Sequence, residues 1–283
     1  MATRTRPRRR VRLRWFGIAF ILLWSLIPIY WTINTSLQTE AQAGTRPAHY
    51  LPPAPTVKNY ATLLGGSGGI PDQIRQSALN IVIECCAATI VTVVLSTLAA
   101  YAFARMRFRG RNLLFYAVLA TMAFPAYTTL IPLYRIMSDF RLVNTYTGIV
   151  LVYVSGFLPL ATWIMYNYLN SLPAAIEEAG LVDGASRMQI LRHVLLPLTM
   201  PGIISTAIIT FLFSWTQFLF PLVLSTDLST EPLTVVVQAL QGQHIVPTTL
   251  LSAAGVIAIA VPAVIGLTLN RYIVNGLLTG SVK

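Results

Sequence analysis

Residues 171–201, SLPAAIEEAGLVDGASRMQILRHVLLPLTMP, form a polar segment between two long apolar runs. A charged group at the middle of a membrane helix costs about 2.5–3.5 kcal/mol on insertion scales. The segment therefore leaves the membrane and returns to it, as a loop between two spans. Its charged residues are Glu177, Glu178, Asp183, Arg187 and Arg192.

The first half of this loop predicts a short helix. Ser171 is a candidate N-cap, and Pro173 lies in the first turn, where a missing N–H costs nothing. Gly180 and the pair Asp183-Gly184 predict the end of this helix, because Asp-Gly is a turn signal.

The second half predicts another short helix and a return to the membrane. Ser186, with Gln189 three residues later, has the spacing of a capping box. Pro197 and Pro201 mark the re-entry into the next apolar run. Small residues along the loop would let the surface of another protein approach its backbone closely: Ala174, Ala175, Ala179, Gly180 and Ala185.

The same stretch resembles the Glu-Ala-Ala loop in the permease subunits of binding-protein-dependent ATP-binding cassette (ABC) importers. That loop reads Glu-Ala-Ala, three residues, Gly, nine residues, Ile, one residue, Leu-Pro. Here Glu178-Ala179-Gly180 is followed at the same spacing by Gly184, Val194 and Leu196-Pro197, with Gly180 and Val194 as the two departures. Segments 99–111, 181–186 and 271–283 resemble the maltose-type branch of sugar importers.

The resemblance implies an all-helical integral membrane protein with the type I importer permease fold, and a cytoplasmic coupling helix within residues 171–199. It implies a heterodimer with a second permease subunit, two ATPase subunits, an extracytoplasmic solute-binding protein and a sugar or related solute. ATP and Mg²⁺ would be bound by the ATPase subunits, and no cofactor by this chain. A solvated loop without a partner is the alternative. The expected coupling residues are Glu177, Glu178, Ala179, Gly180, Asp183, Gly184 and Ala185.

Composition also indicates a membrane protein. Hydrophobic residues make up 55% of the chain and charged residues 10%, against about 25% charged in an ordinary soluble domain. The formal charge of +11 would suggest a nucleic-acid partner only if the basic residues gathered on one folded surface. They do not, so we expect no nucleic-acid partner.

The chain carries no motif for catalysis. Residues 65–69 are glycine-rich, but no Gly-Lys-Ser/Thr follows them, so they do not predict a phosphate-binding loop. The adjacent Cys85 and Cys86 lie in an apolar run, which favours inert helix residues over a disulfide or metal site. We expect no catalytic residue, no metal site and no enzymatic activity in this chain.

Apolar runs predict six membrane spans, because each is long enough for a bilayer that needs about 20 residues. They form one permease domain over 15–283, after a basic cytoplasmic N-terminal segment at 1–14. A cleaved signal peptide is the alternative for the first run, but this run exceeds the roughly 7–15 residues of a signal core. A short helix is expected near 57–64 in the polar loop 40–76. The spans lie at about 15–36, 77–104, 112–134, 145–169, 200–224 and 250–272.

The positive charges predict the orientation. With six spans both termini lie on one side of the membrane, and the coupling loop lies on the same side. The segments on that side hold 15 of the 20 Lys and Arg residues. The positive-inside rule places it in the cytoplasm. We therefore expect a multi-pass protein in the lipid bilayer of a bacterial inner membrane, with both termini cytoplasmic.

Two polar stripes within the spans are candidates for lining the translocation path. In the second span, small or polar residues recur every four positions from Asn80 through Glu84 to residue 100, so they share one helix face. Glu84 either lines the path or is an interfacial residue that pairs with Asn80 or a neighbouring helix. In the fifth span, the stripe through Thr206, Thr210 and Ser214 either binds sugar hydroxyls or holds helices together. The candidate lining residues are Asn80, Glu84, Thr210, Ser214, Trp215 and Gln217.

A self-sufficient secondary transporter or channel is the main alternative function. Such a protein is expected to carry more ionisable groups within its spans, and often an internal inverted repeat. The sequence shows neither beyond Glu84. A membrane-embedded enzyme is disfavoured because no catalytic set is present.

Overall fold

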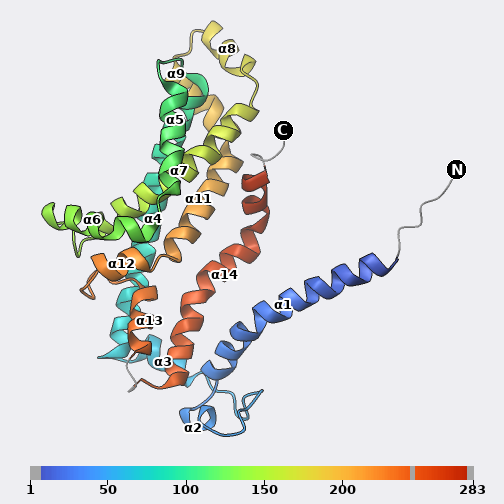
Figure 1. Cartoon of the computed structure of the whole chain (residues 1–283), viewed down its shortest axis with the longest axis vertical. Helices are drawn as coiled ribbons and strands as arrows, with labels where there is room; N and C mark the ends of the chain where they lie inside the picture. Colours follow the sequence, from blue (N-terminus) through green and yellow to red (C-terminus); the bar gives the residue numbers. More distant parts are fainter. Residues whose placement is uncertain (1–7, 243–245, 279–283) are drawn as a thin grey trace. The chain divides into compact units, whose positions relative to one another are not determined.

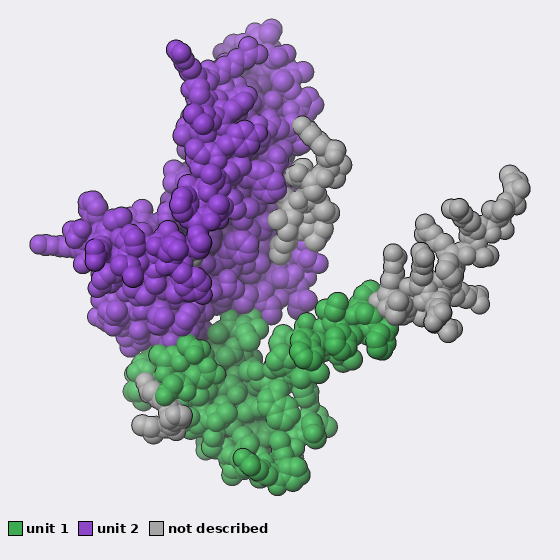
Figure 2. Space-filling model, viewed as in Figure 1, with its two compact units in different colours: residues 1–74, 237–259 green, residues 75–236, 260–283 purple. Residues whose placement is uncertain are grey.

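The structure, a computed structural model, describes residues 8–242 and 246–278. In this part of the chain every regular element is helical (Figure 1). The chain divides into two compact units, unit 1 with residues 1–74 and 237–259, and unit 2 with residues 75–236 and 260–283 (Figure 2). The single domain predicted for 15–283 stays a prediction. Residues 1–7 of the basic N-terminal segment lie outside the described residues.

Unit 1 contains the long helix α1 (Arg8–Ser36), followed by α2 (Glu40–Ala43) and α3 (Lys58–Gly65). The short helix expected near 57–64 is therefore confirmed as α3. Large apolar side chains of α1 are exposed along its length, from Trp15 to Ile33. The amide of Asn59 on α3 donates hydrogen bonds to the carbonyl oxygens of Ser36 (2.8 Å) and Gln38 (2.9 Å), and these bonds fix α3 to the end of α1.

A carboxylate of unit 1 caps the start of α14 (Thr248–Leu278). Glu40 accepts hydrogen bonds from the backbone N–H groups of Thr248 (3.1 Å) and Thr249 (3.2 Å) and from the Thr249 hydroxyl (2.9 Å). Partial burial raises the pKa of Glu40, but the hydrogen bonds from Thr249 and Thr248 outweigh burial and lower it. An anion is favourable here because the first N–H groups of a helix have no intrahelical partner.

The long helices of unit 2 are α4 (Ile70–Arg105), which begins in unit 1, α7 (Tyr146–Ser171) and α11 (Met200–Trp215). Small residues let these helices pack closely. A Cβ atom at Gly202 of α11 would lie 2.5 Å from the Tyr168 ring of α7. Ala88 of α4 packs in one buried cluster with Ile149 and Tyr153 of α7.

The predicted third span, 112–134, is not one helix. It consists of α5 (Arg111–Ala120), a 3₁₀ turn (Thr121–Ala123) and α6 (Ala126–Asp139), and the two arms are bent by 104°. Pro125 has an extended backbone (φ −64°, ψ 133°) and separates the arms, because a proline has no N–H to continue the helix before it. Pro132 lies inside α6 without ending it.

The predicted fifth span, 200–224, is likewise divided. Helix α11 ends at Trp215, and the separate α12 (Leu219–Leu224) follows Phe218. The Gln217 carbonyl oxygen, which lies between these helices, accepts a 2.9 Å hydrogen bond from the Thr234 hydroxyl on α13 (Leu233–Gln241). The segment between α11 and α12 is therefore hydrogen-bonded to α13 within unit 2.

Within the described residues, length and composition make four helices candidates for membrane spans, or six if each of two bent pairs is one span. The four are Trp15–Ser36, Ile70–Arg105, Tyr146–Ser171 and Thr248–Tyr272. The bent pairs are Arg111–Ala123 with Tyr127–Asp139, and Arg187–Leu198 with Met200–Trp215. The predicted six spans are the upper limit of this range.

Candidate functional site

The coupling loop predicted at 171–199 forms short helices at one end of the α4, α7 and α11 bundle (Figure 1). They are α8 (Ala175–Val182), α9 (Arg187–Ile190), the π-helical segment η2 (Leu191–Leu195) and α10 (Leu196–Leu198). The loop leads into α11 through a bend of 75°. Its predicted division into two helical parts joined by a turn is confirmed.

Two details of the first helix differ from the prediction. Ser171 is not its N-cap, because it is the last residue of α7 and its hydroxyl donates to the Tyr168 carbonyl oxygen. Gly180 does not end the helix, which continues to Val182. The glycine instead allows close packing within the loop, since a Cβ atom there would lie 3.0 Å from Cγ1 of Ile190.

The turn between the two parts follows the predicted signals. Asp183 is the C-cap of α8, and Gly184 has a φ of +83°. This left-handed conformation favours glycine. Ser186 and Gln189 form the predicted capping box of α9, in which Ser186 Oγ accepts from the Gln189 N–H and Gln189 Oε1 accepts from the Ser186 N–H.

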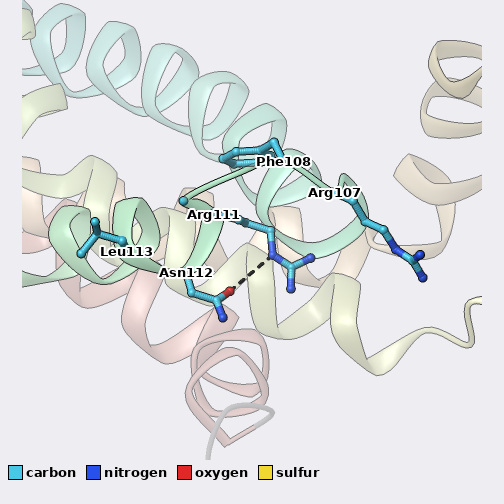
Figure 3. A pocket seen from close by; sticks show the side chains of 6 residues that line it. Arg107, Phe108, Arg111, Asn112 and Leu113 are labelled. Atoms are coloured by element: carbon cyan, nitrogen blue, oxygen red, sulfur yellow. Dashed lines mark hydrogen bonds between the residues drawn. The ribbon is translucent and has the colours of Figure 1, made fainter.

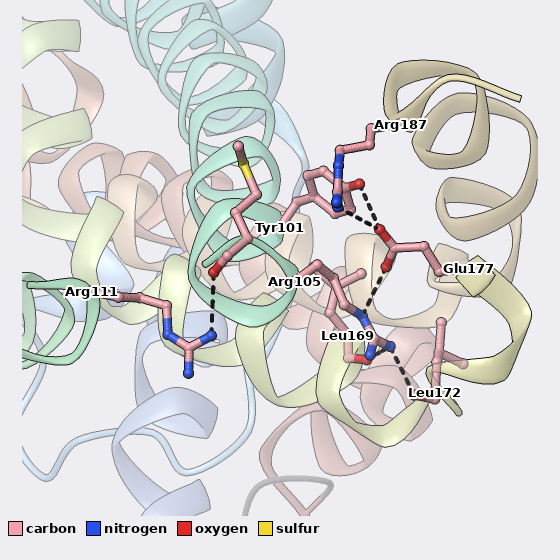
Figure 4. A network of polar contacts seen from close by, with 8 residues as sticks. Tyr101, Arg105, Arg111, Leu169, Leu172, Glu177 and Arg187 are labelled. Carbon is pink, nitrogen blue, oxygen red and sulfur yellow. Dashed lines mark hydrogen bonds and ion pairs between the residues drawn. The ribbon is translucent and has the colours of Figure 1, made fainter. Parts of the chain in front are cut away.

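A buried carboxylate connects α8 to the membrane helices (Figure 4). Glu177 is 6% exposed. Its Oε1 accepts hydrogen bonds from the Tyr101 hydroxyl (3.0 Å) and from Nη1 of Arg187 (3.4 Å). Its Oε2 lies 3.6 Å from Nε of Arg105, at ion-pair distance. The carboxylate therefore contacts α4 and the start of α9 at the same time.

Arg105 extends this network to the end of α7. Its Nη2 donates to the carbonyl oxygens of Leu169 and Leu172, both at 2.8 Å. The last carbonyls of a helix lack intrahelical partners and carry partial negative charge, so a guanidinium is favourable at this end. Arg105 thus links the end of α4, the end of α7 and the start of α8.

Beneath the polar network lies an apolar cluster of residues from α4, α7, α9 and η2. Its buried members are Ala100, Tyr101, Met165, Leu169, Ile190, Leu191 and Leu195. The loop is therefore packed against both membrane helices. The apolar cluster joins α9 and η2 to α4 and α7, whereas Glu177 joins α8 to α4.

The opposite side of the loop is exposed. Glu178, Ala179, Asp183 and Gly184 are all exposed. Large apolar side chains lie beside them, with exposed fractions of 87% for Val182 and 64% for Met188. This side of the loop therefore exposes both charged and apolar side chains.

Sequence reasoning missed the residues that hold the loop in place. Tyr101 and Arg105 are four residues apart, which puts them on one helix face, and both reach Glu177. That spacing was a usable signal, but it does not identify Glu177, which lies 76 residues after Tyr101, as the shared partner. The structure brings Glu177 inward, whereas Glu178 and Asp183 face outward.

The predicted lining residues of α4 are buried inside unit 2. The side chain of Asn80 donates to the carbonyl oxygens of Leu228 and Glu231, each at 2.9 Å, and accepts from the Gln76 amide (2.9 Å) and the Tyr146 hydroxyl (2.7 Å). Glu84 is 0% exposed, and neither of its carboxyl oxygens has a hydrogen-bond partner in the described residues. The proposed pairing of Glu84 with Asn80 is therefore not made.

The predicted lining residues around α11 divide into two groups. Thr210, Ser214 and Trp215 are buried, with exposed fractions of 2%, 1% and 4%. Their burial favours the helix-packing alternative over contact with a solute. Gln217 instead lines a cavity of about 460 Å³ together with Phe157, Phe213 and Phe220. Contact of any of these residues with a solute stays a prediction.

Cys85 and Cys86 are both free. Among the residues that the structure describes, no group of three or more His, Cys, Asp and Glu side chains is placed to hold a metal ion.

Comparison with known proteins agrees with this geometry. Residues 92–278 match the family model described as binding-protein-dependent transport system inner membrane component. The sulfoquinovosyl glycerol transport system permease protein SmoH of Agrobacterium fabrum is 32% identical over 272 residues, which are 96% of this chain and 93% of that protein. The trehalose/maltose transport system permease protein MalG of Thermococcus litoralis is 32% identical over 94% of this chain and 95% of its own.

The fold is also known from a solved structure. A crystal structure of a bacterial ABC transporter involved in the import of the acidic polysaccharide alginate has a chain with a TM-score of 0.83 and 22% identity, covering 96% of this chain and 99% of that one. The predicted fold class, an all-helical membrane protein with the type I importer permease fold, is confirmed. The chain is thus a multi-pass inner-membrane protein, and it belongs to the family of binding-protein-dependent transport system inner membrane components, the permease subunits of ABC importers.

Proposed function

We propose that this chain forms half of the translocation path of an ATP-driven sugar importer and couples to an ATPase subunit through α8. One observation carries the proposal, namely that α8 has two unlike sides. Glu177 on the inner side is held by Arg105 of α4. The outer side exposes Glu178 and Val182. Such a helix can receive a push from a partner and transmit it to the membrane helices.

The energy source is expected to lie outside this chain. The sequence contains no nucleotide-binding motif and no catalytic set. We propose that two ATPase subunits bind ATP and Mg²⁺, and that a second permease subunit completes a heterodimeric pore. An extracytoplasmic binding protein would deliver the solute. Membership of the binding-protein-dependent family supports these partners.

The proposed transmission is a rigid-body movement. Closure of the ATPase pair would displace α8. Because Arg105 bonds to Glu177 and to the last carbonyls of α7, α4 and α7 would move with α8. ATP shifts the equilibrium only to the extent that it binds the closed pair more tightly than the open one.

We propose a sugar or a related glycoside as the solute. The printed names of two relatives support this class, since one is a sulfoquinovosyl glycerol permease and the other a trehalose/maltose permease. The charge distribution supports a cytoplasmic position for the coupling loop and both termini, because their side of the membrane holds 15 of the 20 basic residues.

The proposal is tested in lipid vesicles that contain this chain with and without the products of its neighbouring genes. ATP hydrolysis and uptake of labelled sugars are measured together. We expect both only when the ATPase, the second permease and the binding protein are present. Uptake by this chain alone, driven by an ion gradient, would instead indicate a secondary transporter.

Two variants of the outer side of α8 and its turn test the docking role. Glu178→Lys reverses an exposed charge, and Gly184→Trp places a bulky side chain at the turn. Both variants should insert into the membrane but hydrolyse ATP without transport. Asp139→Lys is the matched control, because Asp139 is also an exposed carboxylate and lies at the end of α6. Normal uptake in both α8 variants would contradict docking at this surface.

A further inference from the structure

The turn between α4 and α5 carries a second basic site that the coupling role does not use. Four arginines alternate with other residues in the seven positions from 105 to 111. Arg105 belongs to the Glu177 network. Arg107 and Arg109 are exposed, and the described residues provide neither a hydrogen-bond nor an ion-pair partner for them. Two guanidinium groups are thus free to bind an anion.

A cavity of about 420 Å³ lies at this turn (Figure 3). Its polar side chains are those of Arg107, Arg111 and Asn112, and its apolar ones are Phe108 and Leu113. No carboxylate lines it. A neighbouring cavity of about 670 Å³ shares the two arginines but contains Glu177 and Glu178. The positive charge is therefore unopposed only in the smaller cavity.

The start of α5 adds further donors to this cavity. Its N-cap is Gly110, with a φ of +80° and no capping side chain. The first N–H groups of a helix have no intrahelical partner and attract anions. Arg111 is held over this end by bonds from Nη1 to the Met106 carbonyl oxygen (3.3 Å) and from Nε to Oδ1 of Asn112 (3.4 Å). The arrangement suits a phosphate group.

The surroundings identify the source of that phosphate. Apolar α4 ends at Arg105 and apolar α5 begins at Arg111, so the turn lies where hydrocarbon meets water. Beyond the arginines, Leu113 is 77% exposed and Tyr116 67% exposed on α5. Exposed aromatic and aliphatic side chains next to arginines are typical of the interfacial zone of a bilayer. A soluble anion would leave this apolar surface uncovered, whereas a lipid acyl chain would cover it.

We propose that the α4–α5 turn is a binding site for an anionic phospholipid. The headgroup phosphate lies between Arg107, Arg111 and the start of α5, and the acyl chains lie along α5. Arg109 of the same turn does not line the cavity but adds to the positive charge that attracts the headgroup. Juxtamembrane basic clusters attract anionic lipids by about 1 kcal/mol per basic residue, or about fivefold in affinity. This proposal does not depend on the solute or on the docking of an ATPase.

The test is a titration of the purified full-length chain in detergent with phosphatidylglycerol, with bound lipid counted by native mass spectrometry. Phosphatidylcholine is titrated in parallel, and excess inorganic phosphate is added as a competitor. We expect phosphatidylglycerol to bind preferentially and to resist inorganic phosphate. Equal binding of the two lipids, or displacement by phosphate, would overturn the proposal.

The double variant Arg107→Gln/Arg109→Gln should bind phosphatidylglycerol about 25-fold more weakly, at about fivefold per arginine. The control Lys58→Gln/Arg135→Gln removes the same charge from two other exposed positions and should bind like the wild type. The variant Arg107→Lys/Arg109→Lys keeps the charge and should retain most of the binding, which separates charge loss from misfolding.

Two results would contradict the site itself. One is unchanged lipid binding in Arg107→Gln/Arg109→Gln. The other is loss of bound lipid when the ATPase subunits are added, because it would make the turn a protein-docking surface instead.

Discussion

Two buried carboxyl groups show how differently one residue type is used in this chain. Glu177 faces two arginines and a tyrosine hydroxyl. Glu84 has no hydrogen-bond partner in the described residues. A buried charge is tolerated when it is paired and hydrogen-bonded, and is costly otherwise. The first residue therefore stabilises the coupling loop, whereas the second reduces the stability of the bundle.

Glu177→Ala is expected to lower the free energy of unfolding by about 3 kcal/mol, because Arg105 would remain buried without its counter-charge. The measurement is thermal unfolding of the purified protein in detergent. Glu178→Ala is the control, since Glu178 is exposed and unpaired in the described residues, and it should change stability little. If the two variants unfolded at the same temperature, the network would not hold the loop.

Glu84→Met is expected to raise the free energy of unfolding, by about 1–3 kcal/mol, because it replaces an unsatisfied buried group with an apolar side chain of similar size. The same unfolding assay applies. Asn80→Leu is the matched control one turn earlier on the same face of α4 and should be destabilising, because it loses four hydrogen bonds. A destabilised Glu84→Met would contradict the view that this carboxyl group weakens the bundle.

At the scale of elements, local sequence signals predicted the helices whose ends are determined locally. The capping box at Ser186 and the turn at Gly184 are formed by residues within three or four positions of one another. The long apolar runs predicted α1, α4, α7 and α14 because their length alone suffices for a span. Signals of this kind need no knowledge of tertiary contacts.

The elements that differ from prediction are those whose ends depend on distant residues. By hydropathy, 200–224 is one apolar run. The helix nevertheless ends within it, and the Gln217 carbonyl oxygen accepts a hydrogen bond from Thr234 of α13. Ser171 is a good N-cap residue by type, yet α7 extends through it and Arg105 satisfies the last carbonyls of that helix. The predicted stripe of α4 is a single face, as expected, but that face packs inside unit 2.

The sequence predicted where along the chain the candidate site lies, but not which of its side chains face inward. The spacing from Glu178 to Pro197 located the loop. Sequence alone did not distinguish the inward Glu177 from the outward Glu178, because the adjacent acids differ only in which helix face they occupy. Only the contacts with Tyr101 and Arg105 decide that difference.

At the scale of the whole molecule, the orientation in the membrane depends on how many spans there are. The bent pair α5–α6 either crosses the bilayer or turns back within it, since its arms are bent by 104°. If it crosses and the other bent pair also does, six spans place both termini on one side. If α5–α6 turns back, five spans place them on opposite sides.

Single cysteines in a chain with Cys85→Ala and Cys86→Ala distinguish these two topologies. Asp183→Cys on the coupling loop and Arg135→Cys on α6 are both at exposed positions. The measurement is labelling of right-side-out and inside-out vesicles with a thiol reagent that does not cross membranes. We expect Asp183→Cys to react only in inside-out vesicles and Arg135→Cys only in right-side-out ones, because the positive-inside rule places the side with 15 of the 20 basic residues in the cytoplasm.

A third single cysteine tests the topology without the positive-inside rule. Arg109→Cys lies in the turn before α5. It reacts from the same side as Asp183→Cys if α5–α6 crosses the bilayer, and from the opposite side if α5–α6 turns back, because α7 alone then separates the two positions. If Arg135→Cys reacted from the same side as Arg109→Cys, α5–α6 would be re-entrant, and the loop at 140–145 would lie on that side too. Helix α7 would then cross the bilayer from the Arg109 side, and the coupling loop would lie on the opposite side from Arg109. Because Arg105 at the end of α4 donates to the carbonyl oxygens of Leu169 and Leu172 at the end of α7, these two helix ends lie together, and we expect Arg109→Cys and Asp183→Cys to react from the same side.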